Sequence, residues 1–571
     1  MNMKFKNIIT GFVLLVTLGS CSNLNEMNID PSRSSSLDPN YQLTQIQART
    51  WGDWILTDPY INFLSSMSQI MTGDWAASNY GGQFRVNAFE MDKLWNQLYG
   101  GLIKEAVDGE YRSRNVETQT NVNAALRVYK VYLFSIITDI FGDVPYFEAG
   151  KGYIDGVKYP KYDSQKEIYA DFFKELAEAT AQFDATKPQM TGDLIYNGDV
   201  TQWKHFANSL RLRLAMHLIK IDPQEAAKQA QAAIDGGLMA SVSDDAVIDH
   251  YKDISSRDAA DYTRNAYAQD LSGWAPQPSA FICASFFNKL YTDNIRGVLP
   301  SDAKDASGNF IDPDNGPADP RTFVYTRFYD TNLRSSDNNY AARPDITDMI
   351  IAHRAYFPIL PGHFAWDPWT NKGFSGDYGH GNFYIGLGTV PQISNYFMNK
   401  AAPGVILTYA ESEFLLAEFY KRIKNSDTDA KSHYDAGYRA AIKHLIQKFK
   451  VPASDLPDNK VEQYLIDYGY KPATGLQQIC EQQWLLHIVN PVEAFNVFRR
   501  TGFPKLKSPS DPTQLSPVIT VDAQIIPRRL CYPILESTDN PVEYKKALDN
   551  LGGTNDWTKP VWWDLNGNNA N

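Results

Sequence analysis

Two stretches of the sequence combine flat aromatic rings with side chains that can form paired hydrogen bonds. They cover residues 51–80 and 353–384, and Gly and Asn are interspersed in both. Sugar rings present C–H faces that stack on indole or phenol, and their hydroxyls bond to Asp, Asn and Arg. We therefore predict a ligand-binding site in these loops. The selected residues are Trp54, Asp58, Trp75, Arg354, Tyr378 and Tyr384, with Trp75, Arg354 and Tyr378 preferred.

Cys283 is added to this candidate set because it lies beside Phe281 and close to Phe286. For any single aromatic residue the competing interpretation is packing in the core, since large rings are mostly buried. The prediction therefore concerns the group of residues in loops and no single ring.

Known catalytic motifs are missing from the sequence. It contains no Walker A loop, no G-x-S-x-G and no H-E-x-x-H, and its nine His are scattered without metal-ligand spacing. No cofactor and no metal site is predicted. A pair of glycosidase carboxylates stays open, because such a pair is recognised by its separation in space. The sequence favours a binding protein over an enzyme.

Composition narrows the class of ligand. The net charge of −12 disfavours nucleic acid and anionic lipid as partners. Aromatic residues make up 13 % of the chain, which points weakly to stacking surfaces and more strongly to helix packing. Cys283, Cys480 and Cys531 lack metal-ligand spacing, so we expect them to be buried as small apolar residues.

The first residues have the features of an export signal. Lys4 and Lys6 precede an apolar stretch at residues 8–18 that is too short to span a bilayer. Leu18-Gly19-Ser20 comes directly before Cys21, the order that a lipoprotein signal peptidase uses. We predict a signal peptide at 1–20, a lipidated Cys21 and a polar tether at 21–45. The alternative is a plain secretory signal whose first mature residue happens to be Cys.

Helical patterns dominate the remaining body, residues 46–571. Ser164 and Glu167 form a capping box before one apolar stripe, a second stripe covers residues 203–218, and Asp222-Pro223 starts a third helix. Further helices are expected at residues 124–141, 408–420, 433–449 and 476–489. Paired helices of this kind resemble tetratricopeptide hairpins. We predict a mainly α fold with helical blocks at about 46–240 and 404–550, around a loop-rich, irregular insert at about 241–403 that carries the ligand-binding subregion.

Several segments, taken in order, resemble the SusD/RagB family of surface lipoproteins. The matching residues are Asn28-Ile29-Asp30-Pro31, residues 125–145, 203–214, 410–418, 499–504 and 527–533, Glu536, Asn540, and Val561-Trp562-Trp563-Asp564. Most of them have a structural explanation. We expect Arg127, Arg213, Arg499 and Arg528 to pair with helix carbonyls or with acids such as Glu411, Glu418 and Glu536. The terminal tryptophans are expected to pack on the body.

The resemblance implies tetratricopeptide hairpins that rest against a TonB-dependent outer-membrane transporter. It implies a protein that covers the transporter as a hinged lid, is anchored by its lipid and faces the cell exterior. The leading hypothesis for its function is capture of an oligosaccharide, such as a fructan, and delivery to the transporter. A peptide-capturing subunit of the same kind of complex and a surface glycosidase are the alternatives.

Overall fold

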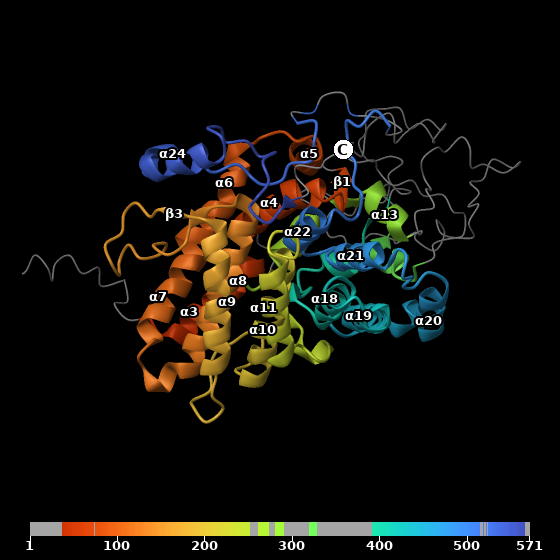
Figure 1. Ribbon diagram of the computed structural model, residues 1–571, viewed down its shortest axis with the longest axis horizontal. Coiled ribbons are helices and arrows are strands. Elements are labelled where there is room, and N and C mark those ends of the chain that lie inside the picture. Colours follow the sequence, from red (N-terminus) through yellow and green to blue (C-terminus); the bar gives the residue numbers. More distant parts are fainter. Residues whose placement is uncertain are drawn as a thin grey trace, which may run out of the picture.

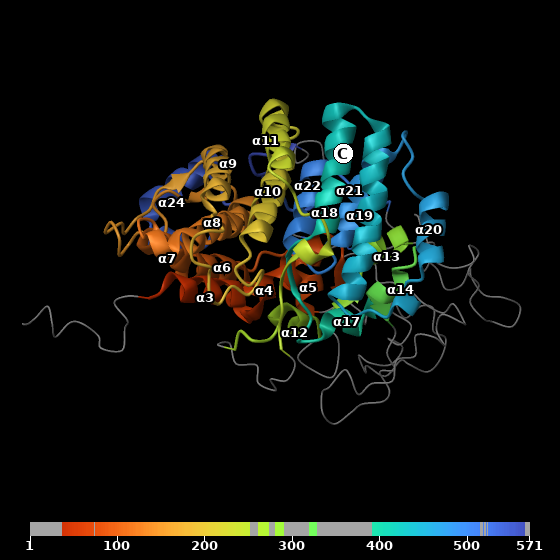
Figure 2. The same ribbon diagram turned by 90° about the horizontal axis from the view of Figure 1, so that it is seen from below.

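The computed structural model describes residues 37–73, 75–251, 261–272, 280–290, 319–327, 391–513, 518, 521 and 523–565. Most of these residues are helical, and the helices pack in antiparallel pairs (Figures 1 and 2). The predicted mainly α class with helical hairpins is confirmed. The predicted signal peptide, Cys21 and most of the tether lie outside the described residues, so these assignments stay predictions.

The N-terminal part of the chain forms the left side of the molecule in Figure 1. Its helices are α3 (Pro39–Gly52), α4 (Trp54–Pro59), η1 (Tyr60–Ser65), α5 (Trp75–Ala77), η2 (Ser78–Gly82), α6 (Ala88–Gln97), η3 (Leu98–Ile103), α7 (Lys104–Ser113), η4 (Glu117–Gln119), α8 (Thr120–Phe141), α9 (Gln165–Gln182), α10 (Val200–His217) and α11 (Pro223–Asp235). Two short strands, β2 (Val144–Pro145) and β3 (Tyr162–Asp163), pair between α8 and α9.

Local sequence signals start and stop these helices as predicted. The Ser164 side chain accepts from the Glu167 amide, and the Glu167 carboxylate bonds back to Ser164, so the capping box is present. Asp222 caps α11, Pro223 occupies its first position, and Gly236 follows its last residue. α8 packs on α9 and α10 packs on α11. Two hairpins therefore stand side by side.

The C-terminal part continues this row of hairpins. Its helices are α18 (Tyr409–Phe419), η9 (Tyr420–Lys424), α19 (Asp427–Gln447), η10 (Ala453–Asp455), α20 (Asp458–Asp467), α21 (Gly475–Leu486), α22 (Pro491–Thr501), α23 (Glu536–Asp539) and α24 (Pro541–Asn550). α19 begins six residues before the predicted start of 433, because the Ser426 side chain accepts from the Asp429 amide and caps it there. α18 packs on α19 and α21, and α10 packs on α18. The two blocks are thus continuous.

Between the blocks, the described pieces of the insert are short elements. They are η5 (Val242–Asp244), β4 (Ala246–Ile248), α12 (Ala266–Ser272), β5 (Ala280–Ile282), α13 (Ala284–Leu290), α14 (Thr322–Tyr325), β6 (Thr326–Arg327), β7 (Gln392–Ile393), α17 (Asn395–Met398) and β8 (Gly404–Leu407). Three of the strands join β1 (Met71–Gly73) in a four-stranded sheet of order β1-β5-β7-β6, with every neighbouring pair antiparallel. The remaining pair, β4 and β8, is also antiparallel.

Buried ion pairs connect distant parts of the helical body. Arg213, 2 % exposed, donates to both carboxylate oxygens of Glu411 at 2.6 and 2.7 Å and to the Ile406 carbonyl at 2.7 Å. This pairing confirms the structural role predicted for Arg213. Glu418 instead pairs with Arg500, at 2.8 Å.

The other predicted scaffold residues have partners too. Arg499 Nη1 donates to the Arg528 carbonyl at 2.8 Å, whereas Glu536 accepts from the Tyr162 hydroxyl at 2.8 Å and not from one of the predicted arginines. Arg127 pairs with Glu175, and Arg528 pairs with Asp564 at 2.6 Å. Trp563 is fully buried and donates its indole N–H to Asp139 at 2.8 Å, so the terminal segment packs on the body. Cys283, Cys480 and Cys531 are free and buried, as expected.

Candidate functional site

Trp54 and Asp58 lie one helical turn apart on α4, where they form a partly exposed cluster with residues of α6. Lys93 Nζ donates to Asp58 Oδ2 at 2.5 Å and to Glu90 Oε2 at 2.8 Å. The same ammonium lies 5.6 Å from the ring centre of Trp54 and 5.4 Å from that of Phe89. Cation–π attraction and two carboxylates thus hold the lysine between two rings.

The surroundings of this cluster raise the pKa values of both Asp58 and Lys93. Burial raises the pKa of Asp58 to about 6, although Lys93 acts against the shift. The pKa of Lys93 is also raised, because the hydrogen bonds and charges of Asp58 and Glu90 outweigh its burial. Phe89 remains 74 % exposed and gives the cluster an aromatic face open to solvent.

Sequence reasoning selected Trp54 and Asp58 but missed Phe89, Glu90 and Lys93. A usable signal was present, since Phe89 and Lys93 are four residues apart and share one face of a helix. Nothing in the sequence, however, indicated that α6 packs against α4.

Trp75 begins the short helix α5, directly after β1. α5 packs on η1, which continues α4, so the segment that carries Trp75 lies beside the helix that carries Trp54 and Asp58. The structure therefore brings together the elements of three predicted site residues.

Cys283 follows β5, and its amide donates to the Ile70 carbonyl at 2.9 Å. Its side chain has no exposed surface, and burial raises the pKa of the thiol to about 12. The thiol is therefore buried and neutral at physiological pH.

The strand directions in the four-stranded sheet show where Trp75 and Cys283 lie relative to each other. β1 and β5 run in opposite directions. The end of β1 that leads to Trp75 therefore lies at one end of the strands, and the end of β5 that leads to Cys283 lies at the other end. A strand of three residues spans about 10 Å. The two positions therefore lie at opposite ends of a short platform.

The predicted site residues Arg354, Tyr378 and Tyr384 lie outside the described residues. The chain that carries them leaves the sheet at Arg327 and re-enters it at Gln392, which is the direct partner of Arg327. Gln392 also pairs with Phe281, the middle residue of β5, and the strand directions point the exit from this pair toward the Cys283 end of the platform. The predicted binding segment thus starts and ends on the sheet that leads to Trp75.

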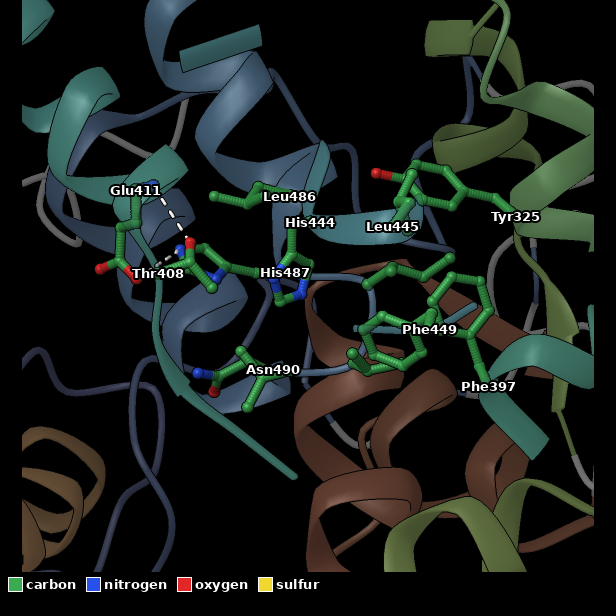
Figure 3. Close-up of a pocket in the computed structure, with 13 residues that line it drawn as sticks. Tyr325, Phe397, Thr408, Glu411, His444, Leu445, Phe449, Leu486, His487 and Asn490 are labelled. Carbon is green, nitrogen blue, oxygen red and sulfur yellow. Dashed lines mark hydrogen bonds and ion pairs between the residues drawn. The ribbon is translucent and has the colours of Figure 1, made fainter. Parts of the chain in front are cut away.

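A small internal cavity is lined by two histidines and a glutamate of the helical body (Figure 3). His444, His487, Glu411, Thr408 and Asn490 converge on it from α18, α19 and the end of α21. His444 Nδ1 lies 2.6 Å from Asp245 Oδ2. Burial lowers the pKa of His487 to about 3, so this ring is neutral. The cavity encloses about 20 Å³, room for a single water molecule and not for a ligand.

The part of the chain that the structure describes holds neither a cluster of metal ligands nor a membrane-spanning helix. No group of three or more His, Cys, Asp or Glu side chains there is placed to hold a metal ion. None of the helices described combines the length and apolarity needed to cross a membrane.

Comparison with known proteins identifies the class. The SusD-like family described as "Starch-binding associating with outer membrane" matches residues 31–341 and 370–533. No curated protein matches the sequence.

Solved structures agree with the family match. A SusD-like protein from Bacteroidetes AC2a is 31 % identical, with a TM-score of 0.78, over 93 % of this chain and 100 % of its own. A chitin-binding protein is 28 % identical, with a TM-score of 0.71, over the same shares of the two chains. A SusD-like protein from Bacteroides thetaiotaomicron shares the fold at 19 % identity, with a TM-score of 0.65 over 92 % of this chain and 99 % of its own.

The chain belongs to the SusD-like family of nutrient-binding proteins associated with the outer membrane. Members of this family bind glycans and do not convert them, so the prediction of a binding protein without catalytic activity is confirmed.

Proposed function

We propose that this protein captures an oligosaccharide at the cell surface and delivers it to a TonB-dependent outer-membrane transporter. The family match over most of the chain is the observation that carries this proposal. Capture alone needs only a binding surface, and delivery needs a partner that accepts the ligand. The continuous row of hairpins offers a rigid body that can rest on such a partner.

The proposed binding surface is the sheet platform together with the neighbouring α4–α6 cluster. Trp75, Arg354, Tyr378 and Tyr384 are its proposed ligand contacts, and Trp54 and Asp58 border it. The segments that carry Trp75 and Arg354 both leave from one sheet, Trp75 from one end and the Arg354 segment toward the other, about one short strand apart. Cys283 is proposed as a supporting residue, since its side chain is buried.

Two glycan classes are the leading ligands. A fructan suits a polar pocket with one tryptophan and nearby Asp and Arg side chains. Oligomers of N-acetylglucosamine are favoured by the 28 % identical chitin-binding protein, which matches over 93 % of the chain. Both present C–H faces to an aromatic ring and hydroxyls to polar side chains.

Calorimetry with the soluble body, residues 37–571, tests the proposal. Levan-type fructan fragments, chitooligosaccharides, maltooligosaccharides and a mixture of peptides would be titrated separately. Saturable binding of one glycan, with the glycan recovered intact after prolonged incubation, is the expected result. Binding of peptides without any glycan would instead establish the peptide-capturing alternative, and release of shorter sugars would establish a glycosidase.

The anchor has a test of its own. Replacing Cys21 with Ser removes the thiol that would accept the lipid, so we expect the protein to leave the membrane fraction. A Cys283→Ser variant is the matched control, since Cys283 is buried and distant in sequence from the signal. Membrane retention of the Cys21→Ser protein would contradict lipidation at this residue.

A further inference from the structure

A second cavity, which shares no residue with the sheet platform, lies between α7, α8, α9 and the connection from β2 to β3. It encloses about 190 Å³. α7 and α9 each pack on α8 and stand on either side of it, so they form two walls of the cavity (Figure 1). This volume is below the range of about 300–1,000 Å³ that encloses drug-sized ligands, so it suits a single sugar ring and not an oligosaccharide chain.

Aromatic rings form much of the cavity surface. Phe134 of α8 and Tyr146, which follows β2, are buried, and their ring centres lie 4.6 Å apart. Phe147 and Tyr111 also line the cavity, and they are 39 % and 41 % exposed. The cavity therefore combines buried rings with rings that are open to solvent. The C–H face of a sugar packs on surfaces of this kind.

Arg114, directly after α7, brings an accessible cation to this cavity. The side chain is exposed, and its guanidinium lies 4.1 Å from the ring centre of Tyr111. Cation–π attraction holds the group in place and uses none of its N–H donors. Among the residues that the structure describes, no acid forms an ion pair with Arg114 or with Lys151, another cation of the cavity lining. Both charges are therefore available to an anionic group.

The remaining cation of the lining, Lys130, is already neutralised. Its Nζ lies 2.5 Å from Glu110 Oε2 and 3.1 Å from Glu175 Oε2. Burial lowers the pKa of Lys130, but the charges of Glu110 and Glu175 raise it by more. The ammonium thus stays charged and fixes Glu110, which lines the cavity as a hydrogen-bond acceptor.

Asp171 of α9 supplies a second acceptor from the opposite wall. Its Oδ2 accepts the Tyr146 hydroxyl at 2.7 Å. Within the described part of the chain, no cation pairs with this carboxylate. Since α7 and α9 lie on either side of α8, the cavity has an accessible cation beside one wall and an acceptor for hydroxyls on the other.

We propose that this cavity binds one acidic sugar residue, a hexuronic acid, at a site distinct from the sheet platform. The planar fork of Arg114 matches the two carboxylate oxygens of such a sugar, and Lys151 adds positive charge. The sugar ring packs on the aromatic rings, and its hydroxyls donate to Glu110 and Asp171. This inference does not depend on which glycan the platform binds.

Calorimetry with the soluble body at constant ionic strength tests the class of ligand. The probes are galacturonic acid, glucuronic acid and the corresponding neutral sugars, galactose and glucose. We expect saturable one-site binding of at least one uronic acid, at least about tenfold tighter than that of its neutral counterpart, because only the acid forms a charge-assisted pair. The proposal is overturned if neither uronic acid binds, or if the neutral sugars bind equally well.

Two arginines at the end of α7 provide matched variants. Arg114→Gln removes the cation from the cavity and should weaken uronic acid binding at least about tenfold. Arg112→Gln makes the same change two positions earlier, where the side chain pairs with Asp108 and does not line the cavity, and should leave the affinity unchanged. Equal affinities of the two variants would overturn the proposal.

A Trp75→Ala variant separates this cavity from the sheet platform. Binding of the uronic acid should persist in this variant, even where binding of a longer glycan is lost. If uronic acid binding instead disappears in Trp75→Ala and persists in Arg114→Gln, the acid binds at the platform and the proposal is wrong. Failure of every glycan to bind at the platform would leave the assignment of this cavity intact.

Discussion

Two ion pairs in this molecule, Arg213–Glu411 and Lys93–Asp58, lie at different depths. In the helical body, Arg213 and Glu411 are almost completely buried and hold α10 against α18. At α4 and α6, Lys93 and Asp58 remain 14 % and 18 % exposed and lie among aromatic rings. The first pair is sealed between helices, whereas the second keeps contact with solvent.

This difference in exposure suits the two pairs to different roles: the buried pair stabilises the helical body, and the partly exposed pair can contact a ligand. The charged groups of a fully buried pair are not accessible to a ligand. Removing one partner leaves the other charge buried and poorly solvated. A partly exposed pair beside rings can exchange a partner for a sugar hydroxyl or for water. The two pairs therefore differ in depth of burial, and only the shallower one, at α4 and α6, belongs to the proposed binding surface.

The largest effect is expected in the helical body. Arg213→Met leaves the Glu411 carboxylate buried without its main partner, so the free energy of unfolding should fall by about 3–5 kcal/mol. Urea denaturation of the soluble body, followed by circular dichroism, measures this loss. Arg439→Met is the control, since Arg439 and Glu462 are 42 % and 50 % exposed and their pair should contribute less than about 1 kcal/mol. If both variants lost the same unfolding free energy, depth of burial would not explain how much an ion pair contributes to stability.

An intermediate effect is expected at the proposed ligand contacts. Trp75→Ala removes a stacking face and should weaken glycan binding by about 1–3 kcal/mol while the fold is retained. Calorimetry with the best glycan of the panel measures the change. Tyr153→Ala is the matched control, because Tyr153 is 84 % exposed and lies in the β2–β3 connection. Unchanged affinity for the Trp75 variant would exclude this residue from the site.

The smallest effect on stability is expected at Asp58. Here the informative result is whether its contribution to the unfolding free energy rises or falls with pH. Because the folded-state pKa is raised to about 6, the native state binds a proton more readily than the unfolded chain. The contribution of Asp58 to stability is therefore fully present below about pH 4 and is lost as the pH rises through about 6. The unfolding free energies of the wild type and Asp58→Asn, compared between pH 4 and 7, should diverge by on the order of 1 kcal/mol. The wild type should lose unfolding free energy relative to Asp58→Asn as the pH rises, and a wild type that instead gains stability relative to the variant would contradict this assignment.

Much of the helical body could be predicted from short-range signals. The capping box at Ser164 and the Asp222-Pro223 start place two helices to within a residue, since caps act over three or four positions. The early start of α19 was missed, because the Ser426 cap precedes the apolar stripe by several residues.

The sheet could not be predicted in the same way. Its strands are two or three residues long and come from distant parts of the chain, from Met71–Gly73 to Gln392–Ile393, so no periodic pattern marks them. The same holds for Lys93 and Arg114, whose roles depend on neighbours that only the folded chain supplies. Trp54 and Asp58 were found because they lie close together in one segment.

The direct pairing of Arg327 with Gln392 has a consequence for how such proteins diversify. Since the intervening segment leaves and returns at adjacent positions, its replacement by one of different length changes neither anchor, and closing a longer loop costs little additional entropy. Exchange of the segment between these two anchors would change the proposed ligand contacts Arg354, Tyr378 and Tyr384 together and leave the sheet pairing unaltered.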